Sequence, residues 1–352
     1  MTDMNGVSAG SNIDDKSSGP RASRMRRSIL VSAALVIVLG IAGFVAVGRN
    51  DSKSGLSGAL VTSNSTYKNV VTVAGGNAQG SAGNQLDSPS GVAVDASGNV
   101  YVADKENHRV QKCVVIDGTW ACSTFAGSGQ GSAANQFSYP FGLAVDGSGN
   151  VYVADAGNNR VQKWAQDATE GVTIASGLND ARGVAVDASG NVYVADTYNN
   201  QVQKCVVSGT TWTCSTFAGG IDAGSTADLF LQPNGVAVDA SGNVYVADTG
   251  NSRLQKWAQD ATEGATFASA LAGPRGVAVD ASGNVYVADS DNNRIRKCVP
   301  TRRASSCSTV AGGNAQGSDA NQFSNPFGVA VDGLGNVYVA DTDNNRVQKW
   351  SL

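Results

Sequence analysis

Short hydrophobic segments alternate with polar turns along most of this chain, and one such pattern recurs six times. Each copy begins with G-[VL]-A-V-D, passes a Gly-Asn pair and continues through V-Y-V-A-D into a polar bend. A third segment with alternating apolar residues, such as residues 346–350, follows the bend. Short segments of this kind with turn residues at fixed offsets are typical of antiparallel strands rather than helices. The pattern therefore predicts a three-stranded meander in each copy.

The spacing of the copies predicts how these meanders assemble. They begin at Gly91, Gly142, Gly183, Gly235, Gly276 and Gly328, which lie 51, 41, 52, 41 and 52 residues apart. Repeats of this length bury their faces on one another, and four-stranded repeats arranged radially form propeller blades. Segments such as 122–126 and 307–311 supply an outer fourth strand, but no such segment follows the sixth copy. Residues 70–75 have the same pattern, so we expect them to pair beside residues 346–350 and close the propeller.

The repeated segments resemble the NHL repeat over about residues 69–352. The resemblance rests on P-x-G-V-A-V-D, G-N-V-Y-V-A-D and N-N-R-V-Q-K. It implies an all-β, six-bladed β-propeller of a kind that typically serves as an interaction scaffold. The arrangement is also similar to the extracytoplasmic sensor domain of bacterial, actinobacterial-type membrane serine/threonine kinases, although the kinase domain is missing from this sequence. The resemblance therefore implies adhesion, cell-wall binding or partner presentation rather than signal transfer.

An apolar run before the repeats predicts a membrane anchor. Residues 29–48 contain no charge and follow a basic cluster made of Lys16, Arg21, Arg24, Arg26 and Arg27. Twenty helical residues cross a bilayer core of about 30 Å, and basic residues stay on the cytoplasmic side. We expect a cytoplasmic tail (1–28), a transmembrane signal-anchor (29–48), a flexible linker (49–68) and an extracytoplasmic propeller (69–352). The alternative is a secreted protein, cleaved at the small residues 46–48.

Charge and composition restrict the partners and the chemistry. The chain has a net charge of −4, and the five basic residues before the apolar run leave the propeller more acidic still. The basic surface that nucleic-acid binding requires is absent. A single histidine excludes a histidine-ligated zinc site. The sequence predicts no cofactor, no metal and no nucleic acid; the expected partners are the membrane, through residues 29–48, and a protein or cell-envelope ligand.

Six cysteines form three pairs that are each nine residues apart: Cys113/Cys122, Cys205/Cys214 and Cys298/Cys307. In the first pair, Asp117-Gly118 is a strong two-residue hairpin signal. Counting outward from this turn places Cys113 opposite Cys122 at a non-hydrogen-bonded position, where Cα atoms lie about 4.5 Å apart. An exported chain favours disulfides over the alternative of metal binding.

Residues common to all six copies are interpreted as architecture. Asp95, Asp146, Asp187, Asp239, Asp280 and Asp332 each precede a tight turn and are expected to cap it. Asp104, Asp155, Asp196, Asp248, Asp289 and Asp341 each precede an arginine or glutamine by five positions, which predicts a hydrogen-bond network that locks the blade. His108 occupies a position that is asparagine or serine in the other copies, and we interpret it as a surface substitution.

Residues that differ between copies near the axis are the candidate ligand-binding positions. The residue before each repeat glycine is expected at the exposed mouth of the central channel, and Tyr139, Tyr198 and Asn325 are expected nearby. The six mouth positions are Ser90, Phe141, Arg182, Asn234, Arg275 and Phe327. Aromatic and arginine residues at an exposed rim indicate a recognition surface. The alternative is that the phenylalanines plug the channel and the arginines are merely solvated.

A propeller enzyme is the rival function. Some NHL-like propellers are lyases or lactone hydrolases with an axial metal, which here would be a calcium ion held by oxygen ligands. The axial positions that the sequence identifies, such as Ala93, Ala144 and Ala185, are small and apolar. The sequence therefore predicts no catalytic residues and favours a binding module.

Overall fold

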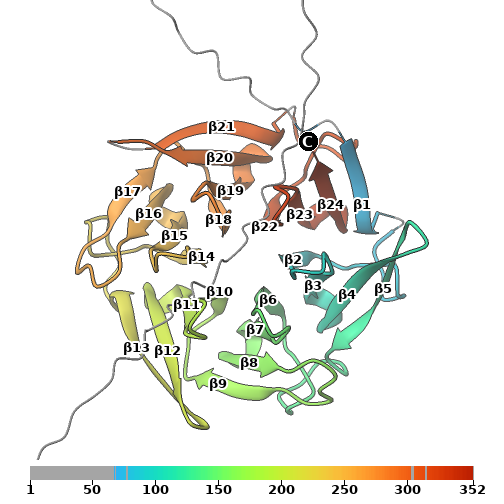
Figure 1. The fold of residues 1–352 in the computed structure, drawn as a ribbon, viewed down its shortest axis with the longest axis horizontal. Coiled ribbons are helices and arrows are strands. Elements are labelled where there is room, and N and C mark those ends of the chain that lie inside the picture. Colours follow the sequence, from blue (N-terminus) through green and yellow to red (C-terminus); the bar gives the residue numbers. More distant parts are fainter. Residues whose placement is uncertain (1–66, 68, 77, 303–304, 314, 352) are drawn as a thin grey trace, which may run out of the picture. The chain divides into compact units, whose positions relative to one another are not determined.

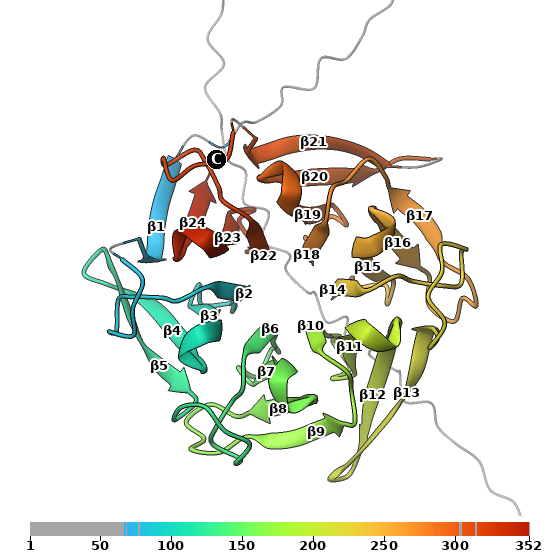
Figure 2. The same cartoon turned by 180° about the vertical axis from the view of Figure 1, so that it is seen from behind.

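The computed structural model describes residues 67, 69–76, 78–302, 305–313 and 315–351. Six four-stranded antiparallel sheets surround a central axis as blades of a propeller (Figures 1 and 2). This confirms the predicted all-β, six-bladed architecture. The predicted tail and membrane span lie outside the described residues, as does the linker apart from Tyr67. Within the described residues, no helix is both long and apolar enough to cross a membrane.

Each blade runs outward from an inner strand at the axis. The inner strands of blades 1–6 are β2 (Pro89–Val94), β6 (Pro140–Val145), β10 (Ala181–Val186), β14 (Pro233–Val238), β18 (Pro274–Val279) and β22 (Pro326–Val331). The second strands are β3 (Val100–Asp104), β7 (Val151–Asp155), β11 (Val192–Asp196), β15 (Val244–Asp248), β19 (Val285–Asp289) and β23 (Val337–Asp341). The third strands are β4 (Arg109–Ile116), β8 (Arg160–Trp164), β12 (Gln201–Ser208), β16 (Arg253–Trp257), β20 (Arg294–Pro300) and β24 (Arg346–Ser351). The outer strands are β5 (Thr119–Ala126), β9 (Val172–Ser176), β13 (Thr211–Gly219), β17 (Ala265–Ala268), β21 (Ser305–Gly312) and, in blade 6, β1 (Asn69–Gly75).

The bends between second and third strands are short 3₁₀ helices: η1 (Lys105–Asn107), η2 (Ala156–Asn158), η3 (Thr197–Asn199), η4 (Thr249–Asn251), η5 (Ser290–Asn292) and η6 (Thr342–Asn344). Because strand direction alternates within a blade, these bends and the loops that lead into the inner strands lie on the same face. We call this the rim face. The tight turns that follow the inner strands lie on the opposite face.

The first described strand completes the last blade, as predicted. β1 pairs antiparallel with β24, with Val70 opposite Trp350 and Gly75 opposite Arg346. Val73 on β1 is buried in a core cluster that also contains Val102 of blade 1. β1 therefore closes blade 6 and also packs it against blade 1.

Blades of two kinds alternate around the axis. The second strand is fully buried in all six, because its valine and alanine residues pack against neighbouring blades on both faces. In blades 2, 4 and 6 the third strand carries a buried tryptophan that contacts a phenylalanine of the preceding loop, as in Trp164 and Phe137, with ring centroids 5.5 Å apart. In blades 1, 3 and 5 a cysteine occupies the tryptophan position, and Leu86, Leu178 and Leu271 are buried in the preceding loops.

The odd blades carry the three predicted disulfides. Cys113 bonds Cys122, Cys205 bonds Cys214 and Cys298 bonds Cys307, each with a Cα–Cα distance of 4.0 Å. Cys113 lies directly opposite Cys122 in the β4–β5 ladder, as the hairpin count predicts. Asp117 and Gly118 both have positive φ, as a type I′ turn requires. The cysteines therefore staple the two outermost strands of these blades.

The first aspartate set caps the turns after the inner strands, as expected. Asp95 accepts hydrogen bonds from the backbone N–H groups of Ser97 and Asn99, both at 2.9 Å. The other five aspartates make the same pair of bonds. These carboxylates are therefore committed to local structure.

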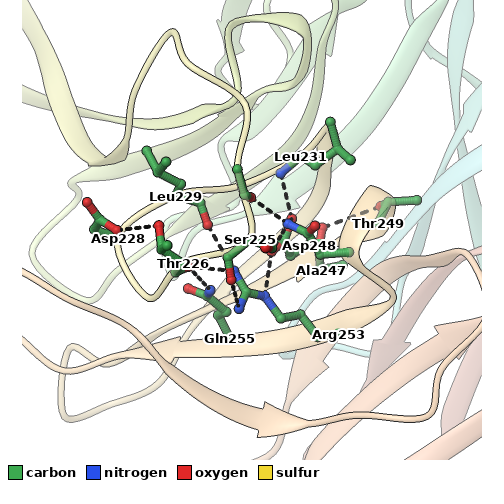
Figure 3. Close-up of polar contacts among 12 residues, drawn as sticks. Ser225, Thr226, Asp228, Leu229, Leu231, Ala247, Asp248, Thr249, Arg253 and Gln255 are labelled. Atoms are coloured by element: carbon green, nitrogen blue, oxygen red, sulfur yellow. Dashed lines mark hydrogen bonds and ion pairs between the residues drawn. The ribbon is translucent and has the colours of Figure 1, made fainter.

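The second aspartate set forms the expected blade-locking network, which Figure 3 shows for blade 4. Asp248 accepts a hydrogen bond from the backbone N–H of Leu231 at 2.8 Å and pairs with Nε of Arg253 at 2.7 Å. The rest of this guanidinium donates to loop carbonyls before the inner strand, namely those of Ser225, Thr226 and Leu229. One arginine thus ties a long rim loop to its own blade.

The network is complete in the blades that are preceded by a long loop. Arg109, Arg160 and Arg346 repeat the pattern below the long loops before blades 1, 2 and 6. The loops before blades 3 and 5 are short. Blade 3 has Gln201 at this position, and the Arg294 side chain of blade 5 is 29% exposed, against 13% for Arg253.

Candidate functional site

The mouth of the central channel on the rim face is built on six closely packed glycines. The glycine of each inner strand lies against the backbone of the next blade: a Cβ at Gly91 would lie 2.4 Å from the carbonyl oxygen of Phe141. The same approach recurs around the axis. Only glycine permits this contact, so each preceding residue is held at the channel mouth, as the sequence predicts.

Two aromatic side chains meet across this mouth. The rings of Phe141 in blade 2 and Phe327 in blade 6 lie 4.9 Å apart, edge to face, although blade 1 stands between these blades. Arg182 lies over Phe141 at 5.1 Å, and Arg275 lies over Phe327 at 5.2 Å. Such contacts stabilise the cluster through the electron-rich ring faces. The four residues therefore form a continuous band of rings and guanidinium groups over the channel.

The other two mouth positions differ from the sequence expectation of an exposed rim, because their side chains point into the blade contacts. Ser90 is 1% exposed and donates to the carbonyl oxygen of Phe141 at 2.9 Å. Asn234 is 3% exposed, donates to Oγ1 of Thr249 and accepts from Arg182. Both residues support the band rather than face solvent.

Asn325 also belongs to this support. Its side-chain oxygen accepts a hydrogen bond from Arg275 at 2.5 Å, and its amide donates to Asp343. Burial lowers the pKa of the Arg275 guanidinium overall, and the nearby carboxylate of Asp291 offsets only part of this effect. Arg275 is therefore held in place from two sides.

Tyr139 and Tyr198 differ from the rest of the predicted set because they are exposed. Tyr139 is 40% and Tyr198 is 50% exposed, and they are the two aromatic residues among the large exposed hydrophobic residues of the described chain. Both line one pocket on the rim face, with a volume of ≈ 430 Å³. Phe141 and Arg182 line the same pocket, so the structure brings four of the nine predicted residues together there.

The pocket extends over the rim loops and bends of blades 1, 2 and 3. Its other lining residues are Lys105, Glu106, Ala156, Gly157, Asn159, Asn179 and Asp180. Ala156 and Gly157 belong to η2, whereas the equivalent bends in blades 5 and 6 carry Asp291 and Asp343. The small side chains of η2 leave room between the two exposed tyrosines.

His108 is a site residue that the sequence interpretation missed. Its Nδ1 accepts a hydrogen bond from the backbone N–H of Tyr139 at 3.1 Å, and its ring contacts the tyrosine ring at 4.8 Å. In four other blades the same backbone bond goes to an asparagine side chain, as between Asp180 and Asn159, and blade 4 has Ser252 at this position. The position is a latch between blades, and histidine adds a contact that positions Tyr139.

Where the pocket lies, adjacent blades lack a side-chain hydrogen bond that joins the other blades. At four blade junctions the first bend residue donates a side-chain hydroxyl bond to the next inner strand, as Thr197 does to the carbonyl of Pro233 at 2.8 Å. Blades 1 and 2 have Lys105 and Ala156 instead, which carry no hydroxyl. The pocket therefore spans the two junctions that lack this bond.

The channel below the band is lined by small and apolar residues. A cavity of ≈ 50 Å³ lies beside the glycines, and a second of ≈ 220 Å³ on the far side is lined entirely by valine, alanine and leucine. The predicted axial residues Ala93, Ala144 and Ala185 are part of this wall. In the part of the chain that the structure describes, no three His, Cys, Asp or Glu side chains gather as metal ligands would.

Comparison with known sequences identifies the repeated unit. The NHL repeat profile matches residues 86–113, 137–164, 178–205, 230–257, 271–298 and 323–350. NHL repeat-containing protein 3 of Homo sapiens is 28% identical over 123 residues, which is 34% of this chain and 35% of that protein. The Mus musculus protein of the same name is 26% identical over 180 residues, 49% of this chain and 50% of that protein. These matches thus cover at most half of each relative.

Solved structures share the propeller. A protein of unknown function from Bacteroides thetaiotaomicron has a TM-score of 0.62 at 20% identity, covering 80% of this chain and 75% of that one. A gluconolactonase from Xanthomonas campestris has a TM-score of 0.58 at 14% identity, covering 80% and 89%. A streptogramin B lyase has a TM-score of 0.55 at 12% identity, covering 80% and 96%. At these identities the likeness shows the fold alone.

Proposed function

Because the six repeats of this chain are NHL repeats closed into one propeller, we propose that the protein is an extracytoplasmic binding module that recognises a protein or cell-envelope ligand through its rim face. The observation that carries the proposal is the ≈ 430 Å³ pocket, in which the exposed Tyr139 and Tyr198 lie beside Phe141 and Arg182. Exposed aromatic residues next to arginine are typical of binding hot spots. A pocket of this size falls in the range of small-ligand sites, about 300–1,000 Å³.

The start of the described chain lies away from the rim pocket. The Tyr67 hydroxyl donates to the carbonyl of Gly335 at 2.8 Å, in the turn after the inner strand of blade 6. This turn lies on the face opposite the rim. Tyr67 therefore lies on the face opposite the rim pocket, and the start of the described chain does not cover that pocket.

The chemistry of the channel favours binding over the rival enzymatic function. Carboxylates that recur in every blade are used in turns and blade networks. The polar residues that line the two channel cavities are Ser90, Arg182 and Asn234, and the other lining residues are apolar or glycine. The lyase and the gluconolactonase share the fold at 12% and 14% identity, which carries no argument for their activities in this chain.

Photo-crosslinking in intact cells tests the proposal. A photoreactive residue is placed at Tyr198 and, in a second variant, at Tyr139; the matched control is Ile116, which is 56% exposed on a hairpin of the opposite face. The proposal predicts one specific adduct at both tyrosine positions and none at the control. Equal adducts at all three positions, or none at the tyrosines, would contradict it.

A further inference from the structure

The charges that line the rim pocket are already paired with one another. Lys105 lies 3.0 Å from Glu106, and Arg182 lies 2.7 Å from Asp180. Two cations and two anions leave the pocket without a net charge. A charged ligand would have to displace one of these partners to gain an ion pair of its own, so the electrostatics favour a neutral ligand.

Arg182 in particular has little capacity left for an anion. Its Nε donates to Asp180 at 2.7 Å, Nη1 to Asn234 at 2.9 Å, and Nη2 to the Tyr198 hydroxyl at 3.4 Å. Its guanidinium plane is occupied as well, since it lies over the rings of Phe141 and Tyr198. Bidentate recognition of a phosphate or carboxylate needs two free N–H groups on one edge. This arginine instead fixes the orientation of the aromatic rings.

The aromatic faces that remain are presented as platforms. Tyr198 is half exposed, and its ring is oriented by its contacts with Arg182. Tyr139 is 40% exposed, and its orientation is fixed by His108. Both tyrosines are thus held in place before any ligand arrives, which lowers the entropic cost of binding. Two rigid exposed rings at the edge of one pocket match a ligand with apolar faces.

Hydrogen-bonding groups surround these platforms. Asn159 and Asn179 are exposed on the pocket wall, and the Tyr139 and Tyr198 hydroxyls add groups that both donate and accept. A ligand that fits therefore needs apolar faces, a belt of hydroxyl or amide groups and no net charge. A pyranose sugar has this combination, because its C–H bonds lie on the ring faces and its hydroxyls project around the edge.

We infer that the rim pocket between blades 1, 2 and 3 binds a neutral oligosaccharide, whose sugar rings stack on Tyr198 and Tyr139. The inference rests on the proposed function and names its ligand class. The pocket volume of ≈ 430 Å³ accommodates a short segment of such a chain, and the open rim face lets the rest of a longer glycan pass over it.

The variants that test this come from the chain itself. The bends of blades 2 and 4 have Gly157 and Gly250 where blade 3 has Tyr198, and Asn325 of blade 6 occupies the position of Tyr139 with the same positive φ. Tyr198→Gly and Tyr139→Asn are therefore compatible with the fold. Tyr198→Phe keeps the stacking face, and Val172→Ala on the outer strand of blade 2 is the control.

The measurement is saturation-transfer NMR on the full chain with chitotriose, cellotriose and maltotriose as neutral probes and 3′-sialyllactose as the anionic probe. We expect at least one neutral trisaccharide to bind. Tyr198→Gly and Tyr139→Asn should each raise its Kd at least tenfold, whereas Tyr198→Phe and Val172→Ala should change it less than threefold. The inference is overturned if no neutral probe binds, if the anionic probe binds as tightly, or if the tyrosine variants leave the Kd unchanged.

The two experiments separate the two claims. A protein adduct at Tyr198 together with no binding of any neutral sugar would overturn the saccharide inference and leave the binding module standing. A glycan adduct at Tyr198 supports both claims. No adduct and no sugar binding would overturn both.

Discussion

The imidazole Nδ1 of His108 accepts a hydrogen bond from the backbone N–H of Tyr139, 3.1 Å away in the next blade. In four other blades an asparagine side chain accepts the same bond, as Asn293 does from the backbone N–H of Asn325. We expect His108→Asn to keep the bond and lose only the ring contact, which costs about 0.5–1.5 kcal/mol. His108→Ala loses both and has a methyl group at a positive φ, so the total cost should be about 1 kcal/mol larger. Urea unfolding measures the stability of both variants. Equal stability of the two would show that the hydrogen bond to the Tyr139 backbone contributes nothing.

Loop anchoring by arginine predicts a difference between two chemically similar substitutions. Arg253→Gln removes three bonds to the loop at 220–232 and should destabilise the protein by about 2–3 kcal/mol. Arg294→Gln removes a pair on a more exposed side chain, and blade 3 already has a glutamine there, so its cost should stay below about 1 kcal/mol. Limited proteolysis adds a second readout: only the Arg253 variant should be cleaved in the loop. Similar cleavage in both would refute the anchoring role.

The missing hydroxyl at the pocket predicts a stabilising substitution. Ala156→Thr places a hydroxyl where Thr197 donates to the next blade, with the Ala181 carbonyl as acceptor. One added hydrogen bond should raise the free energy of unfolding by about 0.5–1.5 kcal/mol, and Thr197→Ala should lower it by a similar amount. Chemical denaturation of the two variants provides the comparison. A destabilised Ala156→Thr would mean that the junction cannot accommodate the side chain.

The turn aspartates predict a loss of stability in acid. Partial burial raises the pKa of Asp239, but hydrogen bonds from Asn243, Tyr245 and Ser241 outweigh this and lower it overall. A carboxyl whose pKa is lower in the folded state stabilises the protein above its unfolded value, about 3.9, and loses that contribution as the pH falls through the folded value. Asp239→Asn should therefore reduce stability at pH 6 and flatten its dependence on pH below 4. An unchanged slope between pH 2 and 5 would count against this role.

Closure by β1 predicts that residues 69–76 are indispensable. Their deletion removes the outer strand of blade 6 and exposes the core around Val347. We therefore expect the shortened protein to aggregate and to lose its cooperative unfolding transition. A synthetic peptide of residues 67–76 added in trans should restore the near-ultraviolet circular dichroism of the deleted chain. A scrambled peptide serves as the control. A well-folded deletion variant without the peptide would refute the closure.

The features that the sequence predicts correctly depend mostly on residues that lie close together along the chain. Asp117 and Gly118 determine a turn, the turn determines the register, and the register places Cys113 opposite Cys122. The closure was predictable for a similar reason, because residues 70–75 repeat the outer-strand pattern at a place where one strand is missing. Periodic patterns repeated six times leave few alternatives.

The site was less predictable because its contacts join residues from different blades. Ser90 was expected at an exposed rim, yet its side chain turns toward the carbonyl of Phe141 in the next blade. His108 differed from its sister positions, but its contact with Tyr139 depends on the geometry between two blades. The meeting of Phe141 and Phe327 depends on the diameter of the channel. Distances between residues of different blades cannot be read from a single sequence.

The pairing of β1 with β24 also bears on how the protein is made. A ribosome delivers the chain from its amino end, so β1 is synthesised long before the strand that it will pair with. Until residues 346–351 emerge, a nascent chain has five complete sheets, and β1 and β23 lack their partner strand. Chains with unpaired strand edges tend to aggregate or to bind chaperones. A chain interrupted anywhere before this point cannot close. The propeller can therefore close only after its last strand, β24, has been synthesised.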